Sequence, residues 1–394
     1  AIYSSNNYED KYGDFELLAG FGAKRILGQS ANSIEALKSF FESKPSWLFG
    51  HFNYDLKNEL ENLSSNHLIN FGFENLSFFE PSILLKQAKK SNKIEVYLNE
   101  GVDDPMISSL FEEKLEGAKH FPEMHARMSK AEYLKAIIEL KSEIQYGNIY
   151  EINYCQEFYA EQVEFNPYRG YLKLIEKSRT PFGAFYKNNS DYLLCASPER
   201  YIAKRKEVLI SQPIKGTAKR GNSAEEDEEI KKALQEDLKE QTENVMIVDL
   251  VRNDLSRTAR RGSVEVEELF GVYTFPQVHQ LISTVKSKLK SDVHFTEVFQ
   301  KSFPMGSMTG APKISAMELI EKHEKSRRGL YSGSVGYITP KGDFDFNVII
   351  RSLIFNAKSN YLSLSVGGAI TSMSEPEKEY EECLLKAKAI FEKR

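Results

Sequence analysis

The sequence predicts a mixed α/β protein of the α+β class, with long helices set among many antiparallel strands. One observation behind this prediction is that apolar residues recur at helical spacing over several long segments. A second is that shorter segments alternate between apolar and polar residues, which is typical of half-buried strands. The third is that 41% of the 394 residues are hydrophobic and 28% are charged, a composition that can bury a large core under a charged exterior.

Short strand-like segments separated by turns occupy residues 1–120, which we expect to form an N-terminal part. Alternation predicts strands at 46–52 and 94–98 within it. A polar stretch after residue 120 marks the expected boundary, and the second part is placed at 121–394.

The second part opens with a helix start. Ser129 and Glu132 have the spacing of a capping box, in which each side chain accepts a hydrogen bond from the backbone of the other. Apolar residues follow at helical spacing up to Ile144, and Gly147 is expected to end the helix. The same patterns predict strands and helices along the remaining chain. Strands are predicted at 149–158, 192–196, 208–211, 335–338, 346–355 and 361–366, and helices at 224–250, 313–325 and 377–393.

Charge and cysteine content exclude several classes of protein. The net charge of −5 argues against a nucleic-acid-binding protein, because such proteins usually carry a basic excess that neutralises phosphates. Cys155, Cys195 and Cys383 are too sparse for a disulfide framework, so we expect three reduced, buried thiols. No apolar run is long enough to span a membrane, and the polar N-terminus does not resemble a signal peptide. We therefore expect a cytoplasmic protein with no membrane partner.

Two acidic helix faces are candidate sites for a divalent cation. Three glutamates of the predicted helix 224–250 stand at i, i+4 and i+7, and two in the last helix stand at i and i+3 with a lysine four residues further on. These residues are Glu236, Glu240, Glu243, Glu379, Glu382 and Lys386. Mg²⁺ prefers carboxylate oxygens, although such spacing is more often found on a solvated helix face.

Lys215 is a candidate nucleophile. A predicted strand runs into Pro213, and Gly216 and Thr217 follow the lysine. A lysine held rigidly at the end of a strand can attack an electrophile if its pKa falls from the ordinary value of ~10.4. A lysine in a surface turn would give the same pattern, and spacing alone favours that alternative.

The segment 306–313 offers a site for a small anion. Its Gly and Thr residues precede a helix start at Pro312, where backbone N–H groups are free to bind a carboxylate. It is not a Walker phosphate loop, because three residues instead of four separate its glycines and Ala-Pro follows the second. Other candidates for ligand contacts are His279, Arg351, Gly367 and Gly368.

Taken together and in order, these segments resemble those of the chorismate-utilising enzymes, which include anthranilate, aminodeoxychorismate, isochorismate and salicylate synthases. The resemblance covers roughly residues 125–394. It rests on Ser-Pro-Glu-Arg at 197–200, Pro-Ile-Lys-Gly-Thr at 213–217 and Thr-Gly-Ala-Pro-Lys at 309–313, with further matches at 243–250, 252–255, 278–279, 336–337 and 379–386. It implies an anthranilate synthase component I-like fold, with antiparallel sheets packed as a sandwich flanked by helices. Residues 1–120 would be its variable N-terminal part and 121–394 its chorismate-binding catalytic region.

The resemblance also implies roles for individual residues. Glu243 and Glu382, with Glu240 and Glu379 beside them, would bind the Mg²⁺ that holds the ring carboxylate of chorismate. Glu199 would be the general acid for the departing 4-hydroxyl group. Positions that would contact or line the substrate site are Gly216, Thr217, His279, Thr309, Tyr337, Arg351, Gly367, Gly368 and Lys386.

Lys215 separates the subfamilies within this resemblance. Aminodeoxychorismate synthases have lysine at this position, whereas anthranilate synthases usually have alanine. In the implied mechanism, Lys215 attacks C2 of chorismate as the 4-hydroxyl leaves, and ammonia then adds at C4 and expels the lysine. The expected product is 4-amino-4-deoxychorismate, for p-aminobenzoate and folate biosynthesis. Glu151 and Ala369 depart from the family pattern, since aminating members more often have Gln and Gly there, and the effect of Glu151 does not follow from the sequence.

Ammonia is expected from a separate glutamine amidotransferase subunit, because the chain shows no glutaminase nucleophile elbow. The nearest alternative is an anthranilate synthase component I, which would make anthranilate and pyruvate for tryptophan biosynthesis. Another is a non-catalytic chorismate-binding paralogue, against which the presence of Lys215, Glu199 and the four glutamates argues.

Overall fold

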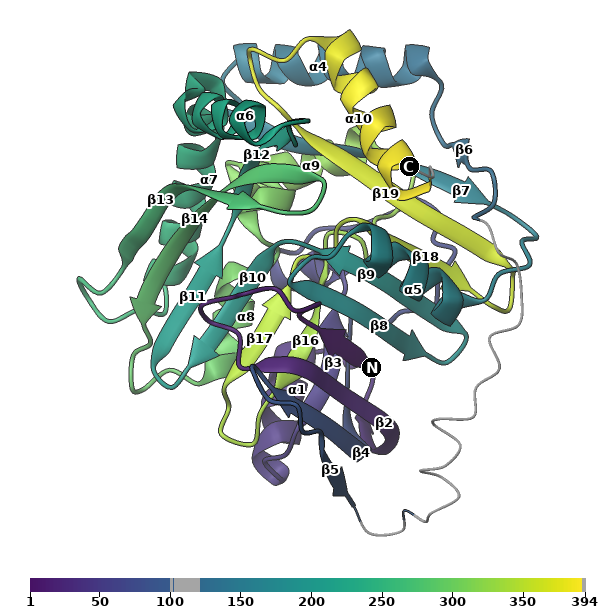
Figure 1. The fold of residues 1–394 in the computed structure, drawn as a ribbon, viewed down its shortest axis with the longest axis vertical. Coiled ribbons are helices and arrows are strands. Elements are labelled where there is room, and N and C mark those ends of the chain that lie inside the picture. Colours follow the sequence, from purple (N-terminus) through teal and green to yellow (C-terminus); the bar gives the residue numbers. More distant parts are fainter. Residues whose placement is uncertain (100–101, 103–120, 392–394) are drawn as a thin grey trace.

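The computed structural model describes residues 1–99, 102 and 121–391. Within these residues, strands β1 to β19 join through hydrogen bonds into one sheet network, and every named pair of strands is antiparallel (Figure 1). Helices pack along the faces of this network. The predicted α+β class, with antiparallel sheets flanked by helices, is confirmed.

The N-terminal part is hydrogen-bonded into the same sheet as the rest of the chain. It forms β1 (Ile2–Ser4), β2 (Phe15–Leu27), α1 (Ser33–Ser43), β3 (Leu48–Phe52), the 3-10 turn η1 (Tyr54–Leu56), α2 (Lys57–Leu60), β4 (Leu76–Ala88) and β5 (Glu95–Leu98). β1 pairs with β8 (Phe182–Asn188), and β3 pairs with β16 (Ser334–Ile338). Both strands predicted in this part, at 46–52 and 94–98, are confirmed as β3 and β5. The predicted boundary between residues 120 and 121 adjoins residues 103–120, which lie outside the residues that the structure describes.

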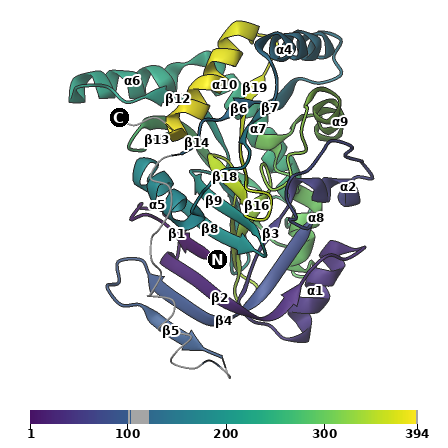
Figure 2. The same cartoon turned by 90° about the vertical axis from the view of Figure 1, so that its right-hand side faces the viewer.

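A second group of elements extends from the middle of the molecule to the end opposite β2, β4 and β5 (Figure 2). It consists of β6 (His125–Ala126), α4 (Lys130–Gln145), β7 (Glu151–Ala160), α5 (Pro167–Lys177), β9 (Asp191–Ser197), β15 (Gly310–Ala311), α9 (Lys313–His323), β18 (Ser352–Asn356), β19 (Tyr361–Ile370) and α10 (Pro376–Phe391). α4 begins with the predicted capping box of Ser129 and Glu132. β7 pairs with β19, and α4, α9 and α10 cover this pair around buried residues such as Ile137 and Leu364.

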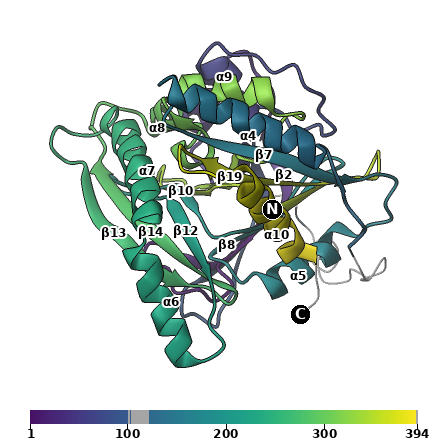
Figure 3. The same ribbon diagram turned by 90° about the horizontal axis from the view of Figure 1, so that it is seen from above.

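The third group lies along one side of the molecule, where α6 and α7 follow one another beside β12 and β14 (Figure 3). It consists of β10 (Arg200–Arg205), β11 (Val208–Gln212), β12 (Ile214–Lys219), α6 (Ala224–Glu236), α7 (Leu238–Ser256), β13 (Glu265–Thr274), β14 (Val278–Lys288), α8 (Phe295–Ser302), η2 (Gly306–Met308) and β17 (Phe344–Asn347). Ile247 of α7, Val285 of β14 and Phe299 of α8 share its hydrophobic core. The three cysteines are free and buried, as predicted.

The prediction of one helix over 224–250 is wrong, because the chain breaks at Asp237. This residue has extended backbone angles (φ −68°, ψ 111°), ends α6, and accepts hydrogen bonds from the backbone N–H groups of Lys239 and Glu240 as the N-cap of α7. Glu236 therefore belongs to α6 and is exposed. It does not share a helix face with Glu240 and Glu243.

The prediction of one strand over 346–355 is also wrong. The chain forms β17 and β18 with a break between them, and Arg351 in that break has a positive φ of 50°. A residue with left-handed backbone angles departs from the extended conformation of a regular strand and interrupts the alternation of side chains. The run is apolar on both sides of the break, so alternation alone did not reveal it.

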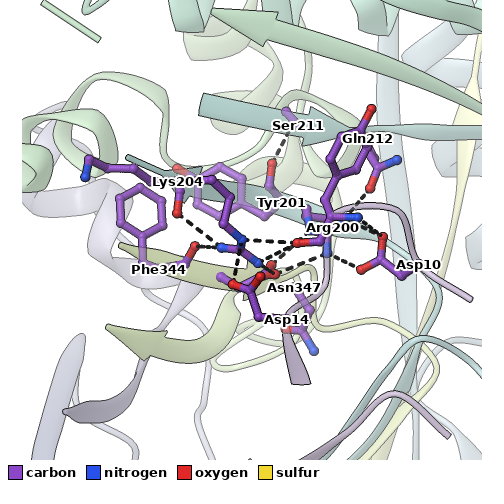
Figure 4. Close-up of polar contacts among 12 residues, drawn as sticks. Asp10, Asp14, Arg200, Tyr201, Lys204, Ser211, Gln212, Phe344 and Asn347 are labelled. Carbon is purple, nitrogen blue, oxygen red and sulfur yellow. Dashed lines mark hydrogen bonds and ion pairs between the residues drawn. The ribbon is translucent and has the colours of Figure 1, made fainter. Parts of the chain in front are cut away.

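Arg200 is buried at the start of β10 and is neutralised by two aspartates (Figure 4). Its guanidinium donates to Asp345 at 2.9 and 3.1 Å and to Asp10 at 3.2 Å, and it also bonds Gln212. Arg205 donates to the same Asp345 at 2.6 Å. The network ties the N-terminal segment to β10 and β17, next to the Glu199 position.

Replacing Arg200 by Met should lower the free energy of unfolding by about 3 kcal/mol, because Asp10 loses its buried cation and Asp345 keeps only Arg205. Urea denaturation measures this loss. Arg252→Met is the control, since its pair with Asp249 is exposed and should contribute less than about 1 kcal/mol. Equal losses in the two variants would contradict the importance of the buried network.

Candidate active site

Lys215 is aimed by an irregularity in β12. The pairing of β12 with β14 shifts register between Ile214 and Thr217, and Gly216 has a φ of 90°, a left-handed conformation that favours glycine. Pro213 just before the strand supplies no backbone N–H to the ladder. Bulges of this kind turn a side chain away from its regular direction. The Pro-Ile-Lys-Gly-Thr sequence thereby directs Lys215 into the protein, where it is 9% exposed.

Lys215 forms a buried ion pair with Glu151. Its Nζ donates to Oε1 of Glu151 at 2.6 Å, and Glu151 lies at the start of β7 with 1% exposure. Burial lowers the pKa of Lys215, but the negative charges of Glu151 and Glu243 outweigh it and raise the pKa above the ordinary value. The alternative of a surface turn lysine is wrong.

Four glutamates lie on α7 and α10 as two pairs. A Cβ added at Gly216 would lie 3.1 Å from Oε2 of Glu240, so the α7 pair adjoins β12. A Cβ added at Gly368 would lie 3.6 Å from Oε2 of Glu379 and 3.9 Å from Oε1 of Glu382, so the α10 pair adjoins β19. The two strands thus hold the carboxylates near the lysine, whose charge acts on members of both pairs.

The negative charge of this cluster is incompletely compensated. Burial raises the pKa of Glu243 to about 7, and it also raises the pKa of Glu240 and of Glu379. Burial acts on Glu382 in the same direction, but its ion pair with Lys386 at 2.6 Å brings its pKa below the ordinary value. A further cation would keep the cluster ionised at neutral pH.

The arrangement fits a hydrated divalent cation better than a tightly enclosed one. Across residues 1–99, 102 and 121–391, no three His, Cys, Asp or Glu side chains are grouped closely enough to hold a metal ion by themselves. Mg²⁺ binds through one or two carboxylates and keeps several waters. Glu243 and Glu379 are buried while Glu240 and Glu382 reach solvent, so both carboxylates and water are present.

Glu199 and Arg351 meet because β9 pairs with β18. Glu199 follows β9 and is 4% exposed, and burial raises its pKa to about 7 against a hydrogen bond from Ser307 and the charges of Lys215 and Arg351. Burial lowers the pKa of Arg351 to about 10, with Glu199 acting in the opposite direction. The guanidinium makes no hydrogen bond or salt bridge within the described residues. It is therefore free to bind a carboxylate of a ligand.

Gly367, Gly368 and Lys386 lie beside the glutamates of α10. The Nζ of Lys386 donates to the backbone carbonyl of Gly367 at 3.0 Å, and a Cβ added at Gly368 would lie 3.9 Å from the same Nζ. The two glycines therefore leave room for the lysine ammonium group beside β19. Thr217 is exposed on β12, two residues beyond Lys215. The double glycine and Lys386 thus lie beside the α10 glutamates, while the Thr217 hydroxyl accepts a hydrogen bond from Gln280 at 3.3 Å.

His279, Thr309 and Tyr337 have protein partners. His279 is fully buried, with Nε2 2.8 Å from Oδ1 of Asp227. The Thr309 hydroxyl donates to backbone carbonyls of its own turn. Tyr337 lies on β16 and packs edge-on against Phe15, and no described contact links it to the glutamates. The structure thus gives His279 and Thr309 partners other than the lysine and the glutamates, and it places Tyr337 in a separate aromatic cluster.

The sequence did not reveal two contacts within the site. Glu151 was noted only as a departure from a family pattern, and no spacing signal joins it to Lys215, which is 64 positions away. The hydrogen bond from Ser307 to Glu199 was equally hidden. The first of these contacts joins the start of β7 to β12, two strands that are not paired with each other among the described residues.

Comparison with known proteins identifies the family. A family model described as chorismate binding enzyme matches residues 8–392. Anthranilate synthase component I from Streptococcus pneumoniae TIGR4 shares the fold, with a TM-score of 0.84 and 23% sequence identity over 98% of this chain and 94% of that one.

Curated relatives are similar over about two thirds of the chain. It is 37% identical over 266 residues to "Aminodeoxychorismate synthase component 1" of Salmonella typhimurium, covering 68% of this chain and 58% of the relative. It is 40% identical over 264 residues to "Aminodeoxychorismate synthase, chloroplastic" of Arabidopsis thaliana, covering 66% of this chain and 28% of the relative. The chain thus spans between about a quarter and three fifths of these relatives. None of its described helices is long and apolar enough to cross a membrane, and the predicted cytoplasmic location stays a prediction.

Gly216→Ala should destabilise the protein more than Gly262→Ala. Both glycines have positive φ, but a Cβ at Gly216 would lie 3.0 Å from Leu281 and 3.1 Å from Glu240, whereas nothing lies within 4 Å at Gly262. We expect a loss of about 1 kcal/mol for Gly262→Ala from backbone strain and about 2 kcal/mol or more for Gly216→Ala. Urea denaturation of both variants measures the difference, and equal losses would contradict the close approach.

Proposed function

The chain belongs to the chorismate-binding enzyme family, and we propose that it aminates chorismate at C4 to give 4-amino-4-deoxychorismate, on the route to p-aminobenzoate and folate. The observation that carries this proposal is the position of Lys215, a buried amine whose charge interacts with Glu199 and with Glu240, Glu243 and Glu382 of α7 and α10. The names of the curated relatives support the same reaction. An anthranilate synthase would need no nucleophilic amine at this position.

Lys215 acts as the nucleophile in this proposal. Its Nζ attacks C2 of chorismate, the ring double bonds shift, and the 4-hydroxyl leaves with a proton from Glu199. A carboxyl group with a pKa of about 7 holds a proton in half of the molecules at neutral pH, which suits a general acid. Ammonia then adds at C4, and the bond between C2 and Nζ breaks. The covalent step divides one difficult displacement into two easier ones.

Mg²⁺ is proposed to bind between α7 and α10, through Glu243 and Glu382 with Glu240 and Glu379 beside them. When bound, it would neutralise the excess charge of these carboxylates and attract the ring carboxylate of chorismate. The guanidinium of Arg351, which has no hydrogen-bond or ion-pair partner among the described residues, would bind a carboxylate of the substrate.

Ammonia is proposed to come from a separate glutamine amidotransferase subunit. The relative from Salmonella typhimurium is named as a component 1, which supports a partner subunit for this chain as well. Free ammonium can replace the partner in an assay of the isolated chain.

Lys215→Ala should abolish the formation of 4-amino-4-deoxychorismate from chorismate and ammonium, because the proposed covalent step that opens C4 to ammonia needs the lysine amine. The product is measured by mass after incubation with chorismate, Mg²⁺ and ammonium. Chorismate binding, measured by calorimetry, should change less than about tenfold because the contacts to the carboxylates remain. Lys219→Ala, an exposed lysine on the same strand, is the control and should retain full activity. Undiminished turnover in Lys215→Ala, or anthranilate as the product of the unmodified chain, would reject the proposal.

Glu243→Gln and Glu382→Gln should each raise the Mg²⁺ concentration for half-maximal activity at least about tenfold, since each removes a ligand charge worth more than 1.4 kcal/mol. Calorimetric titration with Mg²⁺ provides a second readout that is independent of turnover. Glu236→Gln serves as the control because Glu236 is an exposed glutamate at the end of α6. An unchanged Mg²⁺ requirement in both site variants would show that the metal binds elsewhere.

A further inference from the structure

Glu151 is the hydrogen-bond partner that the described residues provide for the ammonium group of Lys215. Its Oε1 lies 2.6 Å from Nζ, and the two side chains are 1% and 9% exposed. Charged groups at this distance form a strong, short hydrogen bond. A proton can pass directly between them without entering water.

The second oxygen of Glu151 lacks a partner. Oε2 is buried and accepts no hydrogen bond from any residue that the structure describes. A buried acceptor without a donor costs about 1–3 kcal/mol. Transfer of the Lys215 proton to Glu151 would neutralise this carboxylate, one of whose oxygens accepts no hydrogen bond from the described residues. The transfer is therefore less costly here than in a site where both oxygens accept hydrogen bonds.

Negative charge faces Lys215 from several elements. The carboxylates are Glu151 on β7, Glu199 after β9, Glu240 and Glu243 on α7, and Glu382 on α10. Nζ of Lys215 donates to the buried Oε1 of Glu151 at 2.6 Å, so the pair consists of an ammonium group and a carboxylate. An ammonium group has no lone pair and cannot attack carbon. The site must remove one proton before the reaction begins, and release of that proton to water is disfavoured.

We propose that Glu151 is a catalytic residue that accepts the proton of Lys215 directly, an inference that rests on the proposed function. One proton moves from Nζ to Oε1 and leaves a neutral amine beside a neutral carboxylic acid. The lone pair of Nζ then forms the bond to C2 of the substrate, and the bond between C4 and oxygen breaks. Glu199 gives its proton to the departing hydroxyl, which leaves as water.

The second half of the reaction restores both groups. Ammonia forms the bond to C4, the bond between C2 and Nζ breaks, and the electron pair returns to Nζ. Glu199 takes a proton from the new ammonium on C4, and Glu151 returns its proton to Lys215. The net change exchanges hydroxyl for amino and releases water, with no oxidation or reduction. Because Glu151 and Lys215 share one proton, the fraction of neutral amine does not depend on pH.

The test compares kcat/KM for chorismate between Glu151→Gln and the unmodified chain from pH 6 to pH 9, with Mg²⁺ and saturating ammonia. In the variant, Lys215 must lose its proton to water, so the ratio of variant to unmodified rate should fall about tenfold per unit as pH decreases. The titration of Glu199 cancels in this ratio. A ratio that is constant with pH, or one that rises as pH falls, would overturn the proposal.

Two further variants control for structural damage. Glu151→Asp keeps a carboxylate, so its rate should be lower by the same factor at every pH. Glu157→Gln removes another buried carboxylate of β7, one paired with Arg127 and remote from Lys215, and its ratio should not vary with pH. If Glu157→Gln shows the same pH dependence as Glu151→Gln, the effect comes from disturbing β7, and the proposal fails.

Chemical labelling tests the pair without relying on turnover. The rate at which acetic anhydride acetylates Lys215, followed by peptide mass spectrometry, reports its fraction of neutral amine in each protein. Acetylation of Lys215 should vary little between pH 6 and pH 9 in the unmodified chain and should rise with pH in Glu151→Gln, and curves of the same shape in the two proteins would overturn the proposal. A clear shift in labelling with no amination by the unmodified chain would instead reject the proposed function, and with it a catalytic role for Glu151.

Discussion

The burial of one ammonium group among several carboxylates is the constraint on which the site depends. Charges removed from water must be paired, and removing one partner of such a pair is costly. Lys215 is enclosed because a bulge in β12 turns it inward, and it remains charged because β7 places Glu151 at 2.6 Å. The same enclosure raises the pKa of Glu199 and of Glu243 to about 7. The same buried electrostatic environment thus sets the charge of Lys215, raises the pKa of Glu199 and gives the glutamates of α7 and α10 an attraction for a cation.

Elements with a local chemical signal could be predicted from the sequence, and those determined by distant contacts could not. The helix α4 begins at its capping box because Ser129 and Glu132 satisfy each other's backbone, a purely local interaction. The break at Asp237 was missed although aspartate favours caps, because helical periodicity continues on both sides of it. The left-handed Arg351 was missed because a positive φ is uncommon for a residue other than glycine and the apolar run continues on both sides of it.

The same distinction holds for the site. Ordered motifs predicted Lys215, Glu199 and the glutamates, and the structure brings these residues together. The partner of Lys215 was not predicted, because contacts between strands 64 positions apart leave no periodic trace. For Tyr337 a motif match predicted a substrate contact, but the motif did not indicate that its ring would pack edge-on against Phe15 in an aromatic cluster.

The sheet that supports the site includes strands from the N-terminal part. β3 forms a ladder with β16, and β1 lies between β2 and β8. A truncation to residues 121–394 would leave β8 and β16 without one of their neighbouring strands. Their unpaired N–H and C=O groups could then form hydrogen bonds with strands of other chains. A shortened form would therefore tend to self-associate through these edges. The N-terminal part, residues 1–120, therefore protects these strand edges and prevents association between copies of the protein through them.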